Sequence, residues 1–198
     1  ARLLVAEGRL GEAIEPLREA ERRYVSDFFP NVRPVAAMAA RVHIRLGQLD
    51  EAQDWARSAG VAPEDALGYL REFEHITLAR LFLAQGDAGK ALGLLARLRD
   101  AAVDGGRFSS LIEIDILRAL ALQSQGDVPK AIEALQEALN LAEPEGYSRP
   151  FTEEPEALQG LLKMSVKRDA SGFLRSLLGQ APRAAATVHP DLIEPLSE

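Results

Sequence analysis

The chain has 198 residues, enough for about one domain with a sizeable hydrophobic core. Alanine and leucine together number 62, against 21 for valine, isoleucine and threonine, a balance that favours helices and argues against all-β and α/β folds. The net charge of −7 argues against a surface that neutralises nucleic-acid phosphates, and the lack of cysteine excludes disulfides and zinc–thiolate sites. No stretch approaches the roughly 18 uninterrupted apolar residues of a membrane-spanning helix.

Four glycines recur at intervals of 39, 39 and 40 residues, and each is followed five positions later by an alanine. The glycines are Gly8, Gly47, Gly86 and Gly126, and the alanines are Ala13, Ala52, Ala91 and Ala131. Each glycine ends one helical pattern and opens the next, which is the place of a left-handed residue after a helix C-terminus. Asp87 and Asp127 follow two of the glycines and are expected to be N-caps. Small residues seven positions before the glycine, at Ala40, Ala79 and Ala119, would let paired helices pack closely.

This repeat resembles the tetratricopeptide repeat in its turn glycine, the alanine after the turn and the small packing positions. Its period is longer than the usual 34 residues, so we expect about five or six extra residues in the connections near residues 28–34, 60–68 and 104–107. We predict an all-α fold of antiparallel helix hairpins. Stacking of the hairpins would form a right-handed superhelical solenoid with a concave inner face.

One repeat unit departs from the pattern, because Asp115 and Arg118 fall on positions that pack inward in the other units. Two explanations stay open. The two side chains pair with each other at i, i+3 spacing, or the repeat register slips at this point.

The repeat pattern ends near residue 145, and prolines and a glycine break the segment that follows. A helix is expected to begin near Thr152 or Glu153, with acidic residues in its first turn, and a second short helix to span residues 171–178. We therefore divide the chain into helical repeats over residues 1–145, a helical pair that caps the solenoid over 146–180, and a linker over 181–198.

Two segments in the C-terminal third carry a family resemblance. The first has the form Ala-x-x-x-Gly-Tyr-x-Arg-x-Phe and is followed by an acidic residue and three leucines. Its residues are Ala142, Gly146, Tyr147, Arg149, Phe151, Glu154, Leu158, Leu161 and Leu162. The second is the run EPLSE at Glu194–Glu198. Both resemble landmarks of the MalT-like, ATP-dependent LuxR-type transcriptional regulators of bacteria.

In that family the first segment ends a helical-repeat region, and the second opens a helix-turn-helix domain. The resemblance implies that this chain is the middle, signal-receiving region of a cytoplasmic regulator, and that its N-terminal ATPase and C-terminal DNA-binding domains are absent here. It further implies that ATP and DNA are bound only through those domains. The signal would be a small effector or a regulatory protein, and the full-length protein could self-associate.

The segments that could suggest catalysis or metal binding are better explained as structural features. The string GDAGKAL over residues 86–92 lacks the phosphate-loop spacing, and the same turn recurs over 126–132 with a proline where a phosphate needs an N–H. His43 and His75 are interpreted as packing residues, and His189 lies in the predicted linker. The acidic group Glu153, Glu154 and Glu156 is interpreted as a helix first turn. We predict no enzyme activity, no metal site and no cofactor.

A row of arginines is the candidate binding feature. Arg2, Arg41 and Arg80 each precede a turn glycine by six residues, on the helix face that lines the groove in tetratricopeptide-like units. The apolar residues Phe73, Ile76 and Leu83 share the stripe of Arg80. Such a surface suits a ligand with a carboxylate or phosphate on an apolar body, or an acidic peptide. The alternative is that these arginines are solvated or pair with nearby acids.

Two functional hypotheses follow. The first is a non-enzymatic signal-receiving domain, in which binding of an effector or a regulatory protein on the inner face favours one arrangement of the solenoid over another. The second is a stand-alone repeat adaptor that binds a peptide segment of a partner protein in the same groove.

Overall fold

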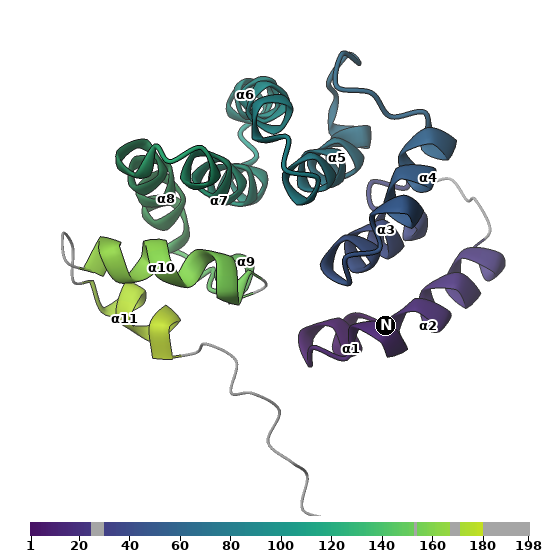
Figure 1. Ribbon diagram of the computed structural model, residues 1–198, viewed down its shortest axis with the longest axis horizontal. Coiled ribbons are helices and arrows are strands. Elements are labelled where there is room, and N and C mark those ends of the chain that lie inside the picture. Colours follow the sequence, from purple (N-terminus) through teal and green to yellow (C-terminus); the bar gives the residue numbers. More distant parts are fainter. Residues whose placement is uncertain (25–29, 153, 167–170, 180–198) are drawn as a thin grey trace, which may run out of the picture.

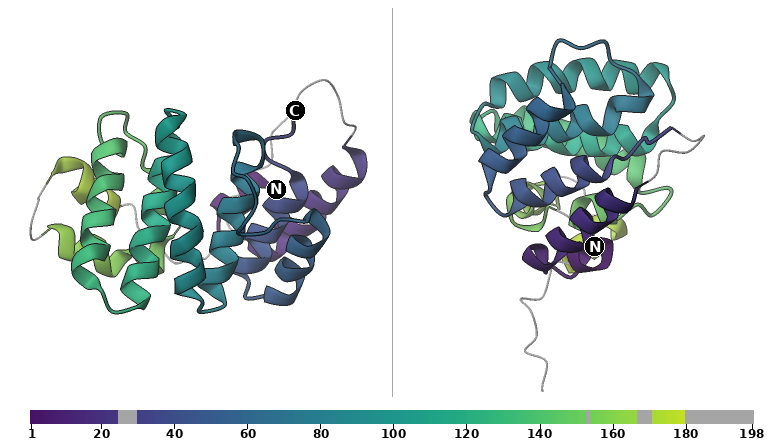
Figure 2. Two further views of the ribbon diagram at one scale, coloured as in Figure 1. Left: turned by 90° about the horizontal axis from the view of Figure 1, so that it is seen from above. Right: turned by 90° about the vertical axis from the view of Figure 1, so that its right-hand side faces the viewer.

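A computed structural model describes residues 1–24, 30–152, 154–166 and 171–179. Every regular element in these ranges is a helix, in the order α1 (Arg2–Ala6), α2 (Leu10–Arg23), α3 (Val35–Arg45), α4 (Leu49–Ala59), the 3-10 helix η1 (Tyr69–Arg71), α5 (Glu72–Ala84), α6 (Ala88–Asp104), α7 (Phe108–Ser124), α8 (Val128–Ala142), α9 (Arg149–Thr152), α10 (Pro155–Val166) and α11 (Gly172–Gly179). The helices follow an arc, with α1 and α2 at one end and α10 and α11 at the other (Figure 1). Neighbouring helices pack side by side along the chain (Figure 2). The predicted all-α architecture of helix hairpins is confirmed.

The four predicted hinge glycines all have the left-handed conformation, with φ angles from 74° to 82°. At Gly86 the backbone amide donates to the carbonyl oxygen of Leu83 at 3.0 Å, and the amide of Asp87 donates to that of Phe82 at 2.9 Å. These two bonds satisfy carbonyl groups that the end of α5 would otherwise leave unpaired. The resulting turn is short, so α6 returns antiparallel to α5.

The predicted N-caps are also confirmed. The side chain of Asp87 accepts a hydrogen bond from the backbone amide of Lys90 at 3.1 Å, and Asp127 accepts one from that of Lys130 at 3.3 Å. A carboxylate at this position pairs with free N–H groups and with the positive end of the helix dipole.

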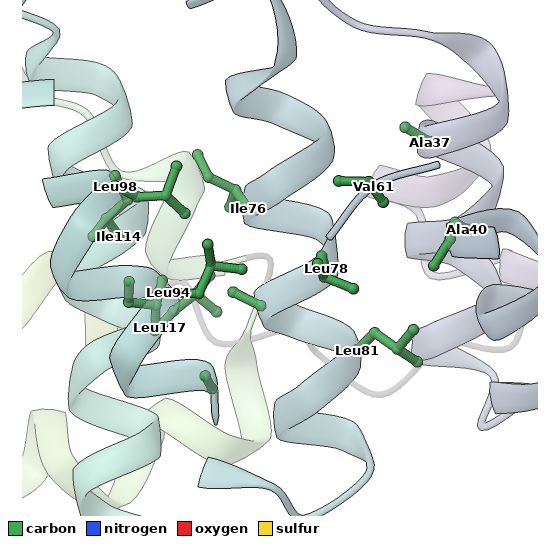
Figure 3. Packing of buried hydrophobic residues seen from close by; sticks show 14 of the residues in the cluster. Ala37, Ala40, Val61, Ile76, Leu78, Leu81, Leu94, Leu98, Ile114 and Leu117 are labelled. Carbon is green, nitrogen blue, oxygen red and sulfur yellow. The ribbon is translucent and has the colours of Figure 1, made fainter. Parts of the chain in front are cut away.

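Alanines let the two helices of a hairpin approach closely. The alanines five residues after the hinges are fully buried, and so are those seven residues before them, namely Ala13, Ala52, Ala91, Ala131, Ala40, Ala79 and Ala119. Small residues also serve the contact between successive hairpins, because Leu81 of α5 points toward α3, the helix that carries Ala40 (Figure 3). Larger side chains at these sites would push the helices apart.

The buried apolar residues form two clusters that meet at α7. The first cluster extends from α3 to α7 and includes Ile114 and Leu117. The second extends from α7 to α11 and includes Ile112 and Ile116. Phe151 of α9 lies in the second cluster and makes an edge-to-face contact with a phenylalanine of α11, at 6.1 Å between ring centroids. The segment after the repeats therefore continues their core.

The extra residues of the long period are placed differently from one unit to the next. Residues 60–68 form a connection, as predicted, and it leads into η1. The predicted long connection near residues 104–107 is wrong, because only residues 105–107 separate α6 from α7. Here the extra residues lengthen both helices to 17 residues, against 11 in α3 and in α4. The segment over 28–34 lies partly outside the described residues.

The irregular unit keeps its register. Asp115 is fully buried in α7, and its Oδ1 accepts hydrogen bonds from Nη1 of Arg118 at 2.6 Å and from Nε of Arg99 at 3.0 Å. Burial raises the pKa of Asp115 although the two arginines oppose the shift. Of the two explanations left open by the sequence, the i, i+3 pairing is the one observed.

The C-terminal segment contains three helices in its described part. A short helix, α9, precedes α10, so the longer helix begins a few residues after the predicted start near Thr152. The second short helix, α11, agrees with the predicted span within one residue. The predicted linker over 181–198, which contains His189, lies outside the described residues. In the described ranges no helix combines the length and apolar character needed to cross a membrane.

Candidate functional site

A cavity of about 830 Å³ lies on the inner side of the arc. Its lining comes mainly from α3, α5 and α7, the first helices of three successive hairpins, with further residues from α1, α2 and α9. Among the described residues, the second helices α4, α6 and α8 contribute nothing to the lining. The concave face therefore includes α1, α3 and α5, the helices that carry the predicted arginine row.

The structure brings five of the six predicted site residues together. Arg2, Arg41, Arg80, Phe73 and Leu83 all line the cavity. The sixth, Ile76, does not reach it. Its side chain is 3% exposed and belongs to the first core cluster, and it points toward α6 (Figure 3). Ile76 lies on the same stripe of α5 as Arg80 and Leu83, as predicted. It is kept from the cavity by the packing of its side chain in the first core cluster.

Two of the arginines form an ionic network with two glutamates. Nη1 of Arg41 donates to Oε1 of Glu113 at 2.7 Å, and Nε and Nη2 of Arg80 donate to the same oxygen at 3.1 and 3.0 Å. The third nitrogen of Arg80, Nη1, donates to Oε1 of Glu154. These four side chains are 13–19% exposed. We call this set, Arg41, Glu113, Arg80 and Glu154, the arginine–glutamate network.

Arg41 is fixed by further contacts. Its guanidinium carbon lies 3.8 Å from the ring centroid of Phe73, and its Nε donates to the hydroxyl of Thr77 at 2.8 Å. That hydroxyl donates in turn to the carbonyl oxygen of Phe73 at 2.7 Å. Cation–π stacking and directed hydrogen bonds together leave the guanidinium little freedom. Arg33 approaches the same ring at 5.4 Å.

The charges of the network shift one another's pKa values. Burial alone would raise the pKa of Glu113, but the charges of Arg41 and Arg80 outweigh it and lower the pKa to about 2. Burial lowers the pKa of Arg41 to about 10, against the opposing charge of Glu113. For Arg80, the carboxylates of Glu154 and Glu113 outweigh burial and raise the pKa. These two arginines and Glu113 are therefore charged at neutral pH.

The cavity as a whole is positive although the chain is acidic. Its lining contains six arginines and two glutamates, whereas the whole chain has a net charge of −7. Arg2, Arg33 and Arg45 are exposed in this lining and form no ion pair within the described part of the chain. A concave surface with an excess of positive charge concentrates the field and attracts anions.

Most of the chain matches a known family of helical repeats. The model of the MalT-like TPR region matches residues 1–168, and every residue that lines the cavity falls within that match. The chain belongs to the MalT-like TPR region family. No curated protein and no solved structure matches the chain. The resemblance seen in the repeat pattern and in the segment that ends at Phe151 is thus supported at the level of this helical region.

Two lining residues of this MalT-like TPR region could have been found from the repeat alone. Glu113 precedes the hinge Gly126 by 13 residues, as Phe73 precedes Gly86 by 13. It therefore occupies the inward-facing repeat position of Phe73 on the next helix. Arg45 precedes Gly47 by two residues, as the lining residue Ala84 precedes Gly86 by two. Arg33 lies just before α3 and has no such counterpart in the lining. For Glu154 the repeat offers no signal, because it lies beyond the last unit.

The histidines of this MalT-like TPR region engage in internal contacts, as interpreted from the sequence. His75 is fully buried, with Nδ1 at 2.9 Å from the carbonyl oxygen of Arg71 and Nε2 at 3.2 Å from Oδ2 of Asp65. Nδ1 of His43 lies 2.7 Å from Oε1 of Gln48. Within the described ranges no group of three or more histidine, aspartate or glutamate side chains is placed to hold a metal ion.

Proposed function

We propose that this MalT-like TPR region is a signal-receiving domain that binds an effector in the cavity inside its arc, as part of a LuxR-type transcriptional regulator. The observation that carries the proposal is the cavity of about 830 Å³, built by three successive repeats. This size falls within the range of about 300–1,000 Å³ that is usual for small-molecule sites. It favours a small effector over the extended peptide strip of the adaptor hypothesis.

The proposed signal is a change in the arrangement of the arc. The lining reaches from α1 and α2 at one end to α9 and Glu154 at the other, so one ligand can contact both ends. A ligand that prefers one spacing of these ends shifts the population toward it, by no more than its difference in affinity for the two states. ATP and DNA would then be bound by other domains of the regulator.

We also propose binding without catalysis. Both glutamates of the cavity already accept hydrogen bonds from arginines. For Glu113 the two arginines lower the pKa to about 2, which suits its carboxylate to charge balance more than to proton transfer. The arginines that remain available suit the recognition of an anion.

The test fills the cavity without changing the core. Ala84 is exposed at the end of α5 and lines the cavity, so Ala84→Phe places a ring in the binding space. In a thermal-shift screen of metabolites against the full-length regulator, we expect at least one compound to raise the melting temperature of the wild type and to have no effect on this variant. A ligand at about 100 times its Kd stabilises the folded state by about 2.7 kcal/mol.

The matched control is Ala20→Phe, at an exposed alanine of α2 outside the lining. It should respond to the compound as the wild type does, in the melting temperature and in transcription from the target promoter. Equal responses of Ala84→Phe and the wild type would place the effector elsewhere and contradict the proposal.

A further inference from the structure

The two glutamates of the arginine–glutamate network are held to different extents. Oε1 of Glu113 accepts three hydrogen bonds, one from Arg41 and two from Arg80. Among the described residues, the side chain of Glu154 accepts a single one, from Nη1 of Arg80. Glu113 lies within the long helix α7, whereas Glu154 lies in the short connection between α9 and α10. Glu154 is therefore the carboxylate that another anion can replace at lower cost.

The surroundings of this contact suit a ligand that carries a carboxylate on an apolar body. The guanidinium of Arg80 is held in place by Glu113, so its Nη1 presents a fixed donor to the cavity. Leu83 of α5 and Leu117 and Leu120 of α7 also line the cavity. Arg45, which forms no ion pair with any described residue, adds to the attraction for an anion.

We infer that Glu154 is an internal stand-in for the anionic group of the effector. The effector's carboxylate takes the place of Glu154 on Nη1 of Arg80, and its apolar body lies against the leucines. This inference rests on the proposed function and adds the class of ligand, an amphipathic carboxylate, and the residue that the ligand displaces.

Displacement of Glu154 has a structural consequence. The contact between Glu154 and Arg80 joins residues 74 positions apart in sequence, and it ties the start of α10 to α5 across the cavity. The rest of α10 packs against α8 and α11, away from α5. When the carboxylate is released, α9 and the start of α10 lose their ionic link to α5. Ligand binding and release of this C-terminal segment are then coupled, and the coupling is reciprocal.

The experiment uses decanoate as the probe and decanol as its neutral counterpart, with the full-length protein. Glu154→Gln removes the competing charge, so we expect the Kd for decanoate to fall about tenfold, equivalent to about 1.4 kcal/mol. The Kd for decanol should stay unchanged. Glu143→Gln removes an exposed charge nearby, outside the cavity lining, and should bind both probes as the wild type does.

Hydrogen exchange of residues 155–166 provides a second readout. Decanoate should raise amide exchange at the start of α10 in the wild type, and Glu154→Gln should show the raised exchange without ligand. If Glu154→Gln proves poorly folded by circular dichroism, Glu154→Asp shortens the side chain by one methylene and retains the charge. For Glu154→Asp we expect the same changes as for Glu154→Gln, namely a lower Kd for decanoate and raised exchange at the start of α10 without ligand.

The outcomes separate this inference from the proposed function. Equal affinity of Glu154→Gln and Glu143→Gln for decanoate would overturn the stand-in role, and so would unchanged exchange in α10. Failure of decanoate to bind any variant would overturn the ligand class. None of these results contradicts the proposed function. The cavity-filling test with Ala84→Phe decides separately whether an effector binds in the cavity.

Discussion

At the scale of single residues, the arginine–glutamate network shows how charges can lie inside a helical arc. Two positive and two negative side chains balance, and each guanidinium donates to at least one carboxylate. Their attraction offsets the loss of hydration that burial causes. The network also spans three hairpins, because Arg41 belongs to α3, Arg80 to α5 and Glu113 to α7. It therefore contributes to the spacing of the helices that line the cavity.

The replacement Glu113→Gln should lower stability at neutral pH, because it leaves Arg41 and Arg80 close together with one carboxylate fewer. Loss of one partner from a buried ion pair costs about 3 kcal/mol. The folded-state pKa of Glu113 is depressed from 4.5 to about 2. Its contribution is therefore fully present above pH 4.5 and is lost as the pH falls toward 2. Urea unfolding of wild type and variant across this range measures the difference.

Glu133→Gln is the matched control, since Glu133 is exposed on α8 and lies outside the network. It should follow the wild-type pH profile within about 0.5 kcal/mol. A gap between wild type and Glu113→Gln that stays constant from pH 7 to pH 2 would show that the Glu113 carboxylate does not stabilise the fold through its charge.

At the scale of helices and turns, the sequence predicts the hinges well because each hinge depends on local chemistry. A left-handed glycine and an aspartate N-cap are recognisable from neighbouring residues alone. Local sequence also explains whether the extra residues of a repeat unit lie in a connection or in a helix. Pro63 lies between two glycines and favours a connection, whereas the segment Ala101–Val103 continues the helical pattern, so α6 extends to residue 104.

The candidate site is less predictable, because it depends on residues that are distant in sequence. The sequence places Arg41 and Arg80 on the inner face but leaves open whether they face solvent, a ligand or an acid. The repeat position of Glu113 answers part of this question, because it places an acid on the same inner face as the two arginines. The sequence shows Glu154 as a first-turn acid and as part of the family-like segment, but not as a partner of Arg80. That contact requires the arc to bring the start of α10 across the cavity from α5.

Two glycines of the same hairpin should respond oppositely to alanine. Gly86 has a φ of 79° and no atom within 4 Å of an added Cβ, so Gly86→Ala should destabilise the fold through backbone strain alone, by about 1–2 kcal/mol. Gly93 is exposed within α6 and is equally free of neighbours, so Gly93→Ala should stabilise by about 0.5–1 kcal/mol. Chemical denaturation measures both. Shifts of the same sign would rule out the left-handed hinge.

At the scale of the whole molecule, the arc behaves as a chain of neighbours. The helices of each hairpin pack against the next hairpin, and the two core clusters have α7 in common. In such arrays stability is approximately a sum of local units and their interfaces. A disturbance at one end of the arc is therefore transmitted through α7 or through the cavity. The contact between Arg80 and Glu154 is a direct route through the cavity.

Deletion of buried side chains on either side of α7 tests this division. Leu94 of α6 belongs to the first cluster and Leu135 of α8 to the second, and both are almost fully buried. Each change to alanine should cost about 2–5 kcal/mol. Hydrogen exchange should rise in α5 and α6 for Leu94→Ala, and in α8 and α10 for Leu135→Ala, because each cavity loosens its own neighbours. An equal rise along the whole chain in both variants would mean that the arc opens as one cooperative unit. The destabilisation at either cluster would then pass fully across α7 to the other cluster.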